Sequence, residues 1–235
     1  MKMDCEVIRP TIPGLASSPP ESEPVLVPQR TRSLRSEFMV TMPTNQAPRV
    51  HRNVTEDVFE PGFEMNEFKC LKQKPQQIAL SEGAQRILET PNAGGNSVWS
   101  EVLSFELFKT IYRMQLLRTE MEIDYFFQNY NITDYCGLVG STRVGVSVTR
   151  AMKYKGIFTE DDARILLKKK LNGVIESTKN VAERDAWQKQ ILHVWAQEQY
   201  IADIFKSVYD GLVDSLKANT MVVVTVVQNA DWIFK

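Results

Sequence analysis

Cysteine and histidine are scarce in this sequence of 235 residues, which holds 3 cysteines and 2 histidines. Cys5, Cys70 and Cys136 are odd in number and far apart, and no C-x-x-C motif occurs, so neither a disulfide framework nor a cysteine zinc site is expected. This pattern favours a reducing, intracellular location, either the cytoplasm or the nucleus. His51 and His193 alone provide too little material for a histidine-based catalytic triad or zinc site.

Long hydrophobic runs are also lacking. The most hydrophobic stretch, residues 221–227, is far shorter than the roughly 20 residues that cross a bilayer as a helix. The first ten residues include acids and lack the apolar core of about 7 to 15 residues that a secretory signal needs. We therefore expect a soluble protein that is neither secreted nor transmembrane and that has no membrane partner.

Neither sign of charge dominates, because 28 Lys and Arg residues stand against 29 Asp and Glu residues, giving a formal net charge of -1. No general cationic field draws the protein onto nucleic acid, so any such contact needs a local basic patch. The phosphate-binding motif G-x-x-x-x-G-K-[ST] is absent, as is a G-x-G-x-x-G after a strand. A nucleotide-binding phosphate loop is therefore not predicted.

Proline and tryptophan divide the sequence into two parts. All 11 prolines lie at or before Pro91, whereas Trp99, Trp187, Trp195 and Trp232 all follow it. Each proline lacks an N–H group and restricts the residue before it, which disfavours long helices and central strands. Residues 1–90 are therefore predicted to form a largely disordered or extended tail, with a short helix near residues 76–88. Residues 91–235 are predicted to form a compact mixed α/β domain.

Hydrophobic periodicity becomes regular after residue 94 and predicts helices alternating with strands. Apolar residues recur with helical spacing over 97–113, 160–177 and 200–216. Strands are expected at 119–127, 132–138, 144–152, 190–196 and 221–227, the first three as an antiparallel meander. The resulting order, α β β β α β α β, predicts a mixed β-sheet flanked by helices.

This order of elements resembles the core of the PD-(D/E)XK nuclease superfamily, the restriction-endonuclease-like fold, over residues 97–227. In that superfamily an Asp near the second strand, an acid and a Lys two positions apart on the third strand, and often a Glu on the first helix gather a divalent metal and activate water for phosphodiester cleavage. The resemblance implies that fold. It also implies Mg²⁺ as the cofactor if the site is active, because hard carboxylate oxygens suit this ion, and otherwise no cofactor.

The match to the site residues of that superfamily is partial. Asp134, which follows Thr133, stands where the aspartate of the second strand is expected, and Glu101 stands where the helix glutamate is expected. On the third strand, the positions of the acid and the lysine are occupied by the uncharged residues Ser147 and Thr149. The motif is therefore degenerate.

Migration of charged residues from neighbouring positions would restore such a site. If it is active, the resemblance implies that Glu101, Glu122 and Asp134 bind the metal, and that Lys153 stabilises the developing charge. Each carboxylate also has a structural interpretation. Glu101 suits the first turn of a helix, Asp134 suits a turn, and the acidic row that includes Glu122 suits a solvated strand face.

Basic residues flank the third strand of the meander and continue on the following helix. They would follow a nucleic-acid backbone if their side chains converge, and would otherwise form a solvated charged face. The predicted contacts are Arg143, Arg150, Lys155, Arg164 and Lys168. The aromatic residues within 125–130 suit base stacking, although aromatic runs on strands are more typical of a core.

Two functions from different classes fit these features. The first is a nuclease-like domain with an eroded active site, acting in nucleic-acid binding or as an interaction module, or as a metal-dependent phosphodiesterase if the active residues have migrated. The second is a structural or scaffolding protein whose residues 1–90 bind the surface of a protein partner, since extended segments wrap large surfaces readily.

Overall fold

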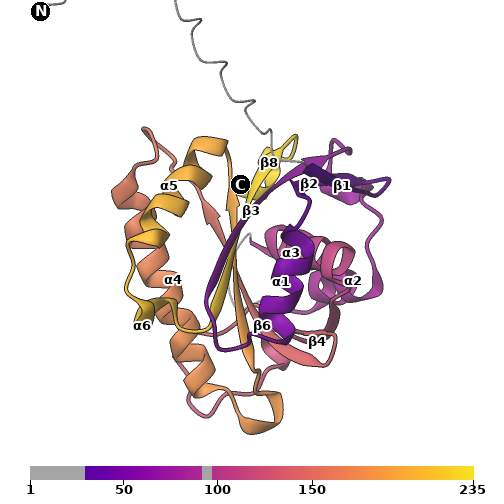
Figure 1. Cartoon of the computed structure of the whole chain (residues 1–235). Helices are drawn as coiled ribbons and strands as arrows, with labels where there is room; N and C mark the ends of the chain where they lie inside the picture. Colours follow the sequence, from indigo (N-terminus) through magenta and orange to yellow (C-terminus); the bar gives the residue numbers. More distant parts are fainter. Residues whose placement is uncertain (1–29, 92–96) are drawn as a thin grey trace, which may run out of the picture.

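Eight strands form one mixed sheet between two layers of helices (Figure 1). The computed structural model describes residues 30–91 and 97–235. Cys5 and residues 1–29 of the predicted tail lie outside the described residues. One face of the sheet carries α1 (Gln46–Thr55), α2 (Glu82–Glu89) and α3 (Val98–Tyr112), and the other carries α4 (Glu160–Asn180), α5 (Gln199–Asp210) and α6 (Asp214–Lys217).

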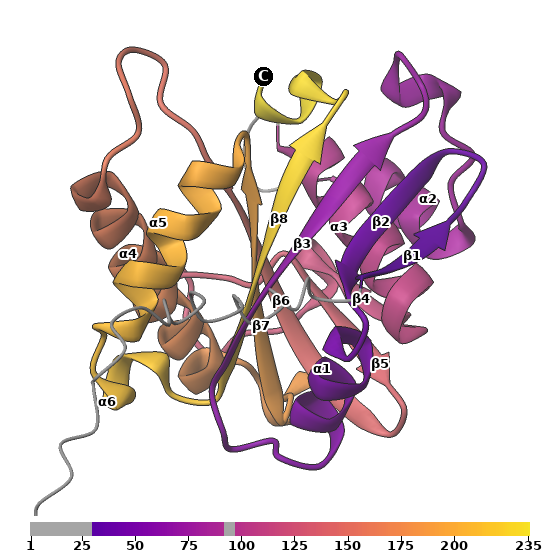
Figure 2. The same cartoon turned by 45° about the horizontal axis from the view of Figure 1, so that its top comes forward.

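The strands follow the order β1-β2-β3-β8-β7-β6-β5-β4 across the sheet. Their bounds are β1 Arg30–Leu34, β2 Phe38–Pro43, β3 Gly62–Cys70, β4 Gln115–Thr119, β5 Tyr135–Val139, β6 Thr142–Ala151, β7 Lys189–Ala196 and β8 Thr220–Gln228. The central strands β3, β8, β7 and β6 are parallel, whereas β1, β2, β5 and β4 pair antiparallel. The carboxyl ends of the parallel strands therefore lie at one end of the sheet, as the arrowheads of β3 and β8 show in Figure 2.

The central strands are buried on both faces. All residues of β7 are buried, as are those of β8 up to Val227. Val223 packs toward α1–α3, whereas its neighbours Val222 and Val224 pack toward α4 and α5. A run of β-branched residues in a core of this kind favours a doubly covered strand, and the predicted central strand at 221–227 is confirmed.

Helix α4 begins at a capping box. The hydroxyl of Thr159 accepts the N–H of Asp162 at 3.3 Å, and the carboxylate of Asp162 accepts the N–H of Thr159 at 2.9 Å. One turn apart along the helix, Ala163, Leu167 and Leu171 are fully buried against the sheet. Within residues 30–91 and 97–235, no helix has both the length and the apolar character required to cross a membrane.

From α3 to β8 the chain follows the predicted order of elements, with the short α6 added before β8. Strands β4, β5 and β6 form the predicted antiparallel meander. The strand predicted at 119–127 is wrong, because β4 ends at Thr119 and a 3-10 turn, η2 (Glu120–Glu122), follows. The turn forms because the carboxylate of Glu122 accepts the N–H of Thr119 at 2.9 Å. The acids expected on one strand face therefore do not form a row.

Residues 30–90 do not form a tail. Strands β1, β2 and β3 extend the sheet beyond β8, and α1 and α2 pack beside α3. Phe38, Val40 and Phe68 are fully buried in the resulting core. The predicted disordered or extended region is therefore wrong for residues 30–90, because prolines such as Pro43 and Pro61 lie at the ends of strands rather than inside them.

Candidate functional site

A cavity of about 400 Å³ lies at the carboxyl end of β6. The antiparallel strand β5 begins opposite Val146. Within the described residues, positions 147–151 of β6 therefore pair as strands with β7 alone. Ligand sites in α/β proteins commonly lie outside the carboxyl ends of parallel strands. The lining combines carboxylates, hydroxyls, cations and apolar groups: Ser97, Ser100, Glu101, Glu120, Asp134, Val148, Thr149, Arg150, Met152, Tyr154 and Lys170.

Asp134 stands directly before β5, at the gap in the sheet. Its N–H donates to the carbonyl of Val146 at 3.1 Å. Its carboxylate accepts the N–H of Val148 at 2.7 Å, a group that a longer β5 would have paired. The side chain therefore continues the strand ladder by one step, and its carboxylate is held in a fixed place beside the cavity.

Glu101 approaches Asp134 from the first turn of α3. It is 4% exposed, and the hydroxyl of Ser97 donates to its carboxylate at 2.8 Å. Burial, together with the nearby charge of Glu101, raises the pKa of Asp134 to about 8. Carboxylates this close do not both ionise readily away from water, so the pair retains a proton at neutral pH. A divalent cation would take the place of that proton.

Glu120 and Lys170 also line the cavity, and neither is among the site residues predicted from the sequence. Glu120, at the start of η2, raises the pKa of Asp134 further, whereas Lys170, on α4, lowers it. Both charges therefore act on the same carboxyl group. The sequence does hold a signal for Lys170, since it lies beside Leu171 on the apolar side of a helix.

The carboxylates suit a Mg²⁺ ion that has few protein ligands. Among the described residues, no group of three or more His, Cys, Asp and Glu side chains is arranged to hold a metal ion. Mg²⁺ is commonly bound through one or two carboxylates, with waters and substrate phosphates completing its octahedron. Glu101 and Asp134 are the two acids that would hold such an ion, and burial, together with the charge of Glu101, raises the pKa of Asp134.

A buried hydrogen-bond network holds α3 against the sheet below the cavity. His193 of β7 lies 2.7 Å from the Ser104 hydroxyl through Nδ1, and 2.9 Å from the Thr225 hydroxyl through Nε2. Ser104 is also 2.9 Å from the hydroxyl of Tyr135, the first residue of β5. Burial lowers the pKa of His193 to about 3, so the ring is neutral. Because Ser104 lies one turn after Glu101, the network fixes the helix that carries this acid.

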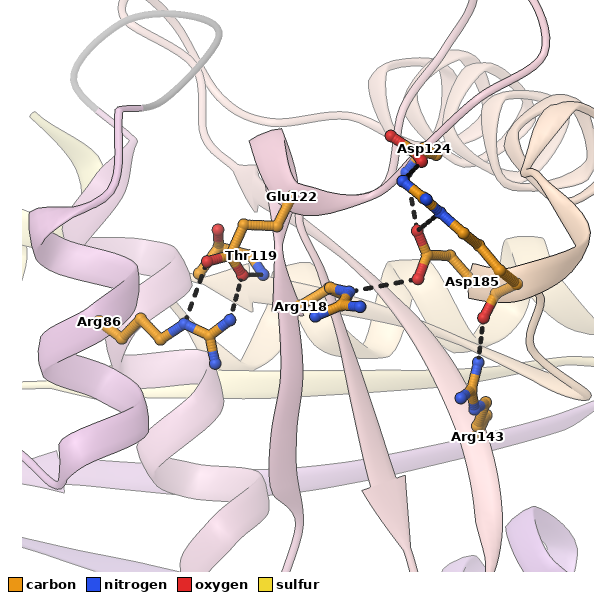
Figure 3. Close-up of polar contacts among 8 residues, drawn as sticks. Arg86, Arg118, Thr119, Glu122, Asp124, Arg143 and Asp185 are labelled. Atoms are coloured by element: carbon orange, nitrogen blue, oxygen red, sulfur yellow. Dashed lines mark hydrogen bonds and ion pairs between the residues drawn. The ribbon is translucent and has the colours of Figure 1, made fainter.

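Glu122, a predicted metal ligand, does not line the cavity. Figure 3 shows it beside Arg86 and Thr119. Arg86 of α2 donates to both of its carboxylate oxygens, one of them at 3.2 Å, and the N–H of Thr119 donates as well. Burial alone would raise the pKa of Glu122, but the hydrogen bonds from Arg86 and Thr119 lower it. The structure therefore brings Glu101 and Asp134 together without Glu122.

Lys153, the predicted catalytic cation, lies just beyond the end of β6. Its ammonium group pairs with the carboxylate of Asp162 at 2.7 Å, in the first turn of α4. It is not part of the lining of the cavity, where Lys170 contributes an ammonium group instead.

The side chains of β6 alternate between the two faces of the sheet. Val146 and Val148 pack in the cluster under α3, which places Ser147 on the opposite face of the sheet. At the end of the strand, Val148, Thr149 and Arg150 all line the cavity. Of the two predicted motif positions, Thr149 therefore lies at the candidate site and Ser147 does not.

Two of the predicted nucleic-acid contacts, Arg143 and Arg150, lie about 23 Å apart along β6. Arg143 donates to the carbonyl of Arg184, beside the ion pairs that Asp185 makes in Figure 3. Arg150 lines the cavity and donates to backbone carbonyls near the end of the sequence, including that of Lys235 at 3.1 Å. Arg150 therefore lies at the candidate site, and Arg143 does not.

The remaining predicted contacts surround α4. Arg164 pairs with Glu160 within the helix. Lys155 and Lys168 are exposed. The predicted basic residues therefore form separate groups rather than one continuous patch, and Lys170 is the basic residue of α4 that reaches the cavity.

The protein without divalent cations is expected to lose stability as the pH rises from about 6.5 to about 8. The folded state retains the proton of Asp134, whose pKa is raised to about 8, whereas the unfolded chain has released it. One proton changes the free energy of unfolding by at most about 1.4 kcal/mol per pH unit. Below this window the slope is offset by His193, which stays neutral in the folded state while the unfolded chain protonates it.

Denaturant unfolding in EDTA measures this effect at both ends of the window. Above pH 8 the trend reverses, because burial lowers the pKa of Lys189 to about 8 and the unfolded chain then binds the extra proton. The Asp134→Asn variant should show no fall between about pH 6.5 and 8. An equal fall in the variant would assign the proton to another group.

Fold and site together define a three-layer α/β protein with an acid-lined cavity at the carboxyl end of a mixed sheet. A protein from Dictyostelium discoideum, the AAC-rich mRNA clone AAC4 protein, is 43% identical to the chain over 178 residues. The match covers 72% of this chain and 26% of that protein, so the chain spans about a quarter of its relative's length. No protein-family model matches the chain, and no solved structure matches it significantly.

Proposed function

We propose that the protein is a metal-dependent phosphodiesterase that acts on nucleic acid, with the cavity between α3, β5 and β6 as its active site. The observation that carries this proposal is the pairing of Glu101 and Asp134. These acids come from separate elements and line one cavity, where burial, together with the charge of Glu101, raises the pKa of Asp134 to about 8. A phosphodiester is an anion, so a site of this kind needs a metal between its carboxylates and the phosphate.

Four charged residues of the cavity have a role in this proposal. Glu101 and Asp134 would hold Mg²⁺, and Glu120 would provide a third acid that orients water. When bound, the ion supplies Lewis-acid stabilisation of the phosphate and lowers the pKa of an attacking water. The backbone N–H of β6 keeps the carboxylate of Asp134 in place. Lys170 offsets the negative charge that develops on the phosphate.

The resemblance to PD-(D/E)XK nucleases supports this assignment in part. Glu101 lies on the helix before the meander, and Asp134 lies at the start of its second strand. The other charged residues come from different places, because Glu120 follows the first strand and Lys170 belongs to the helix after the meander. The proposed site is therefore a migrated form of the motif.

A second candidate is a nuclease-like domain that binds nucleic acid without cleaving it. The resemblance places the acid and the lysine of the third strand at Ser147 and Thr149, and neither side chain provides a carboxylate or an ammonium group. The fold limits the segment that is available for the scaffolding alternative. Residues 30–90 belong to the strands and helices of the domain, so a partner-binding tail would be confined to residues 1–29.

Calorimetric titration of Mg²⁺ and Mn²⁺ into the full chain tests the proposed ligands. We expect the wild type to bind either ion and to release a proton near pH 7, because the metal replaces the proton of the acid pair. Glu101→Gln should weaken binding by at least about tenfold. Glu122→Gln is the matched control and should bind like the wild type, since Glu122 is engaged by Arg86.

The same proteins are then incubated with single- and double-stranded DNA and RNA in the presence of the metal. Cleavage by the wild type and by Glu122→Gln, with little by Glu101→Gln, supports a phosphodiesterase. Metal and nucleic-acid binding without cleavage supports the second candidate. Metal binding that is lost in Glu122→Gln and retained in Glu101→Gln would contradict the proposed ligand set.

A further inference from the structure

Aromatic rings stand exposed on the segment that leads to Asp134. Phe126, Phe127 and Tyr130 are 65%, 66% and 58% exposed, so they are not part of the core. The ring centroids of Phe127 and Tyr130 lie 6.0 Å apart. A single exposed aromatic residue needs no explanation, but a group of them on one short segment marks a binding surface.

The backbone that carries these rings is pinned to the end of α4. The carbonyl of Asn180 accepts the N–H of Phe126 at 2.8 Å. The side-chain amide of Asn180 accepts the N–H of Phe127 at 2.9 Å and donates to its carbonyl at 2.8 Å. The hydroxyl of Tyr125 accepts the N–H of Thr133 at 2.8 Å. The rings are therefore presented to solvent by a backbone with defined hydrogen bonds.

From this anchor the segment follows α4 back toward the cavity. The side chain of Asn131 donates to the carboxylate of Glu176. The hydroxyl of Thr133 then donates to that of Ser177 at 3.0 Å. The next residue is Asp134, so the segment joins the exposed rings directly to the candidate site.

The distance between rings and carboxylates suits a nucleic-acid strand. Lys170, at the cavity, and Asn180, at the rings, lie about 15 Å apart along α4. This is the length of a few nucleotides. A strand with its scissile phosphate at Asp134 would therefore place neighbouring bases beside the rings.

The rings border a small hollow that has charged and amide groups at its edge, which favours nucleotides over a protein partner. Phe127 and Tyr130 line a hollow of about 240 Å³, together with Glu176, Lys179 and Asn180. The segment itself alternates aromatic and amide side chains, with Gln128, Asn129 and Asn131 between and after the rings. A protein interface has a contiguous apolar core, whereas bases need ring faces with polar groups at their edges.

We propose that Phe126, Phe127 and Tyr130 form a stacking platform for unpaired bases, and that the substrate of the cavity is single-stranded nucleic acid. The assignment of this substrate rests on the proposed phosphodiesterase function. Stacking tolerates any sequence because every base has a π-face, and it requires unpaired bases because those of a duplex are already stacked. Lys170 and Lys179 provide positive charge for the phosphates along the same helix.

Fluorescence anisotropy of the full chain in EDTA tests the stacking platform without cleavage. The probes are labelled oligothymidylate and oligouridylate of about 12 nucleotides, beside a DNA duplex of equal length. We expect the wild type to prefer the single strands. Phe127→Ala with Tyr130→Ala should weaken their binding by about tenfold or more and leave duplex binding unchanged. The salt dependence of the affinity should keep its slope, because no phosphate contact is removed.

Controls separate stacking from general hydrophobic contact. Phe59→Ala removes a ring that is 84% exposed in the segment before β3 and is not part of the platform, and it should bind like the wild type. Phe127→Trp with Tyr130→Trp should retain affinity, whereas Phe127→Leu with Tyr130→Leu should not. Three results would each contradict the stacking platform. They are an equal loss of affinity for single strand and duplex in the alanine variant, unchanged binding by that variant, and no binding of single strands by the wild type. Preserved stacking without cleavage in Mg²⁺ would overturn the proposed phosphodiesterase instead.

Discussion

Replacement of Asp134 by asparagine is expected to lower the rate of metal-dependent phosphodiester cleavage by about a thousandfold. Asparagine has nearly the shape of aspartate and its carbonyl oxygen still accepts the N–H of Val148, so the gap beside β6 stays closed. What is lost is the negative charge shared with Glu101, and with it the principal attraction for Mg²⁺. The measurement is single-turnover cleavage of a labelled oligonucleotide at saturating Mg²⁺.

The variant should remain folded and should gain stability above pH 6.5. The reason is that the wild type without metal keeps two acids together in a partly buried cavity, which costs free energy as the pH rises. A thermal melt in EDTA at pH 8 therefore separates loss of function from loss of structure. If a folded Asp134→Asn protein cleaves within about tenfold of the wild-type rate, Asp134 is not a metal ligand of the active site.

The C-terminal half of the fold is predictable because its local patterns agree with its tertiary positions. The capping box of Thr159 and Asp162 marks the start of α4, and the apolar stripe behind it faces the sheet. The β-branched residues of 221–227 suit only a strand covered on both faces, which is where β8 lies. Each of these signals comes from residues near one another in the sequence.

Proline content does not predict the structure of the N-terminal half, because the position of each proline matters more than the number of prolines in the segment. Within residues 30–91 the prolines occupy positions that tolerate them. Pro43 ends β2, Pro48 lies in the first turn of α1, and Pro61 precedes β3. Pro75 opens a 3-10 turn, and Pro91 follows α2. Proline is excluded from the interiors of strands and helices. It does not prevent short strands and helices from forming between one proline and the next.

The candidate site was only half predictable, for reasons of register. Along β6 the valines alternate with Gly145, Ser147 and Thr149, and both sets are largely buried. A strand buried on both faces does not reveal from its sequence which face borders a cavity. The order of elements predicts positions for Glu101 and Asp134, and both residues line the cavity. The position of Glu120 could not be predicted, because it depends on where β4 ends. The hydrogen bond from the N–H of Thr119 to the carboxylate of Glu122 decides that end.

Replacement of Lys170 by methionine is expected to slow cleavage by about a hundredfold without weakening metal binding. Lys170 lines the same cavity as Asp134, and its charge lowers the pKa of that carboxyl group. A fixed cation there stabilises the negative charge that develops on the phosphate. Metal affinity should not fall, because removal of a positive charge beside the ligands favours a bound cation. Calorimetry and single-turnover cleavage of the same preparation measure the two effects.

Lys168→Met provides the matched control, since Lys168 is exposed on the same helix and does not line the cavity. Lys168→Met should cleave like the wild type. Lys170→Arg should retain part of the rate, because arginine keeps the positive charge but has a planar guanidinium group instead of an ammonium group. If Lys170→Met cleaves at the normal rate, the phosphate charge is not stabilised by Lys170. Arg150, which also lines the cavity, would then be the candidate for this role. Arg150 is held by the carbonyls of Ile233 and Lys235, so its guanidinium is already engaged. This difference is why Lys170, rather than the arginine on the strand, is expected to carry the larger effect.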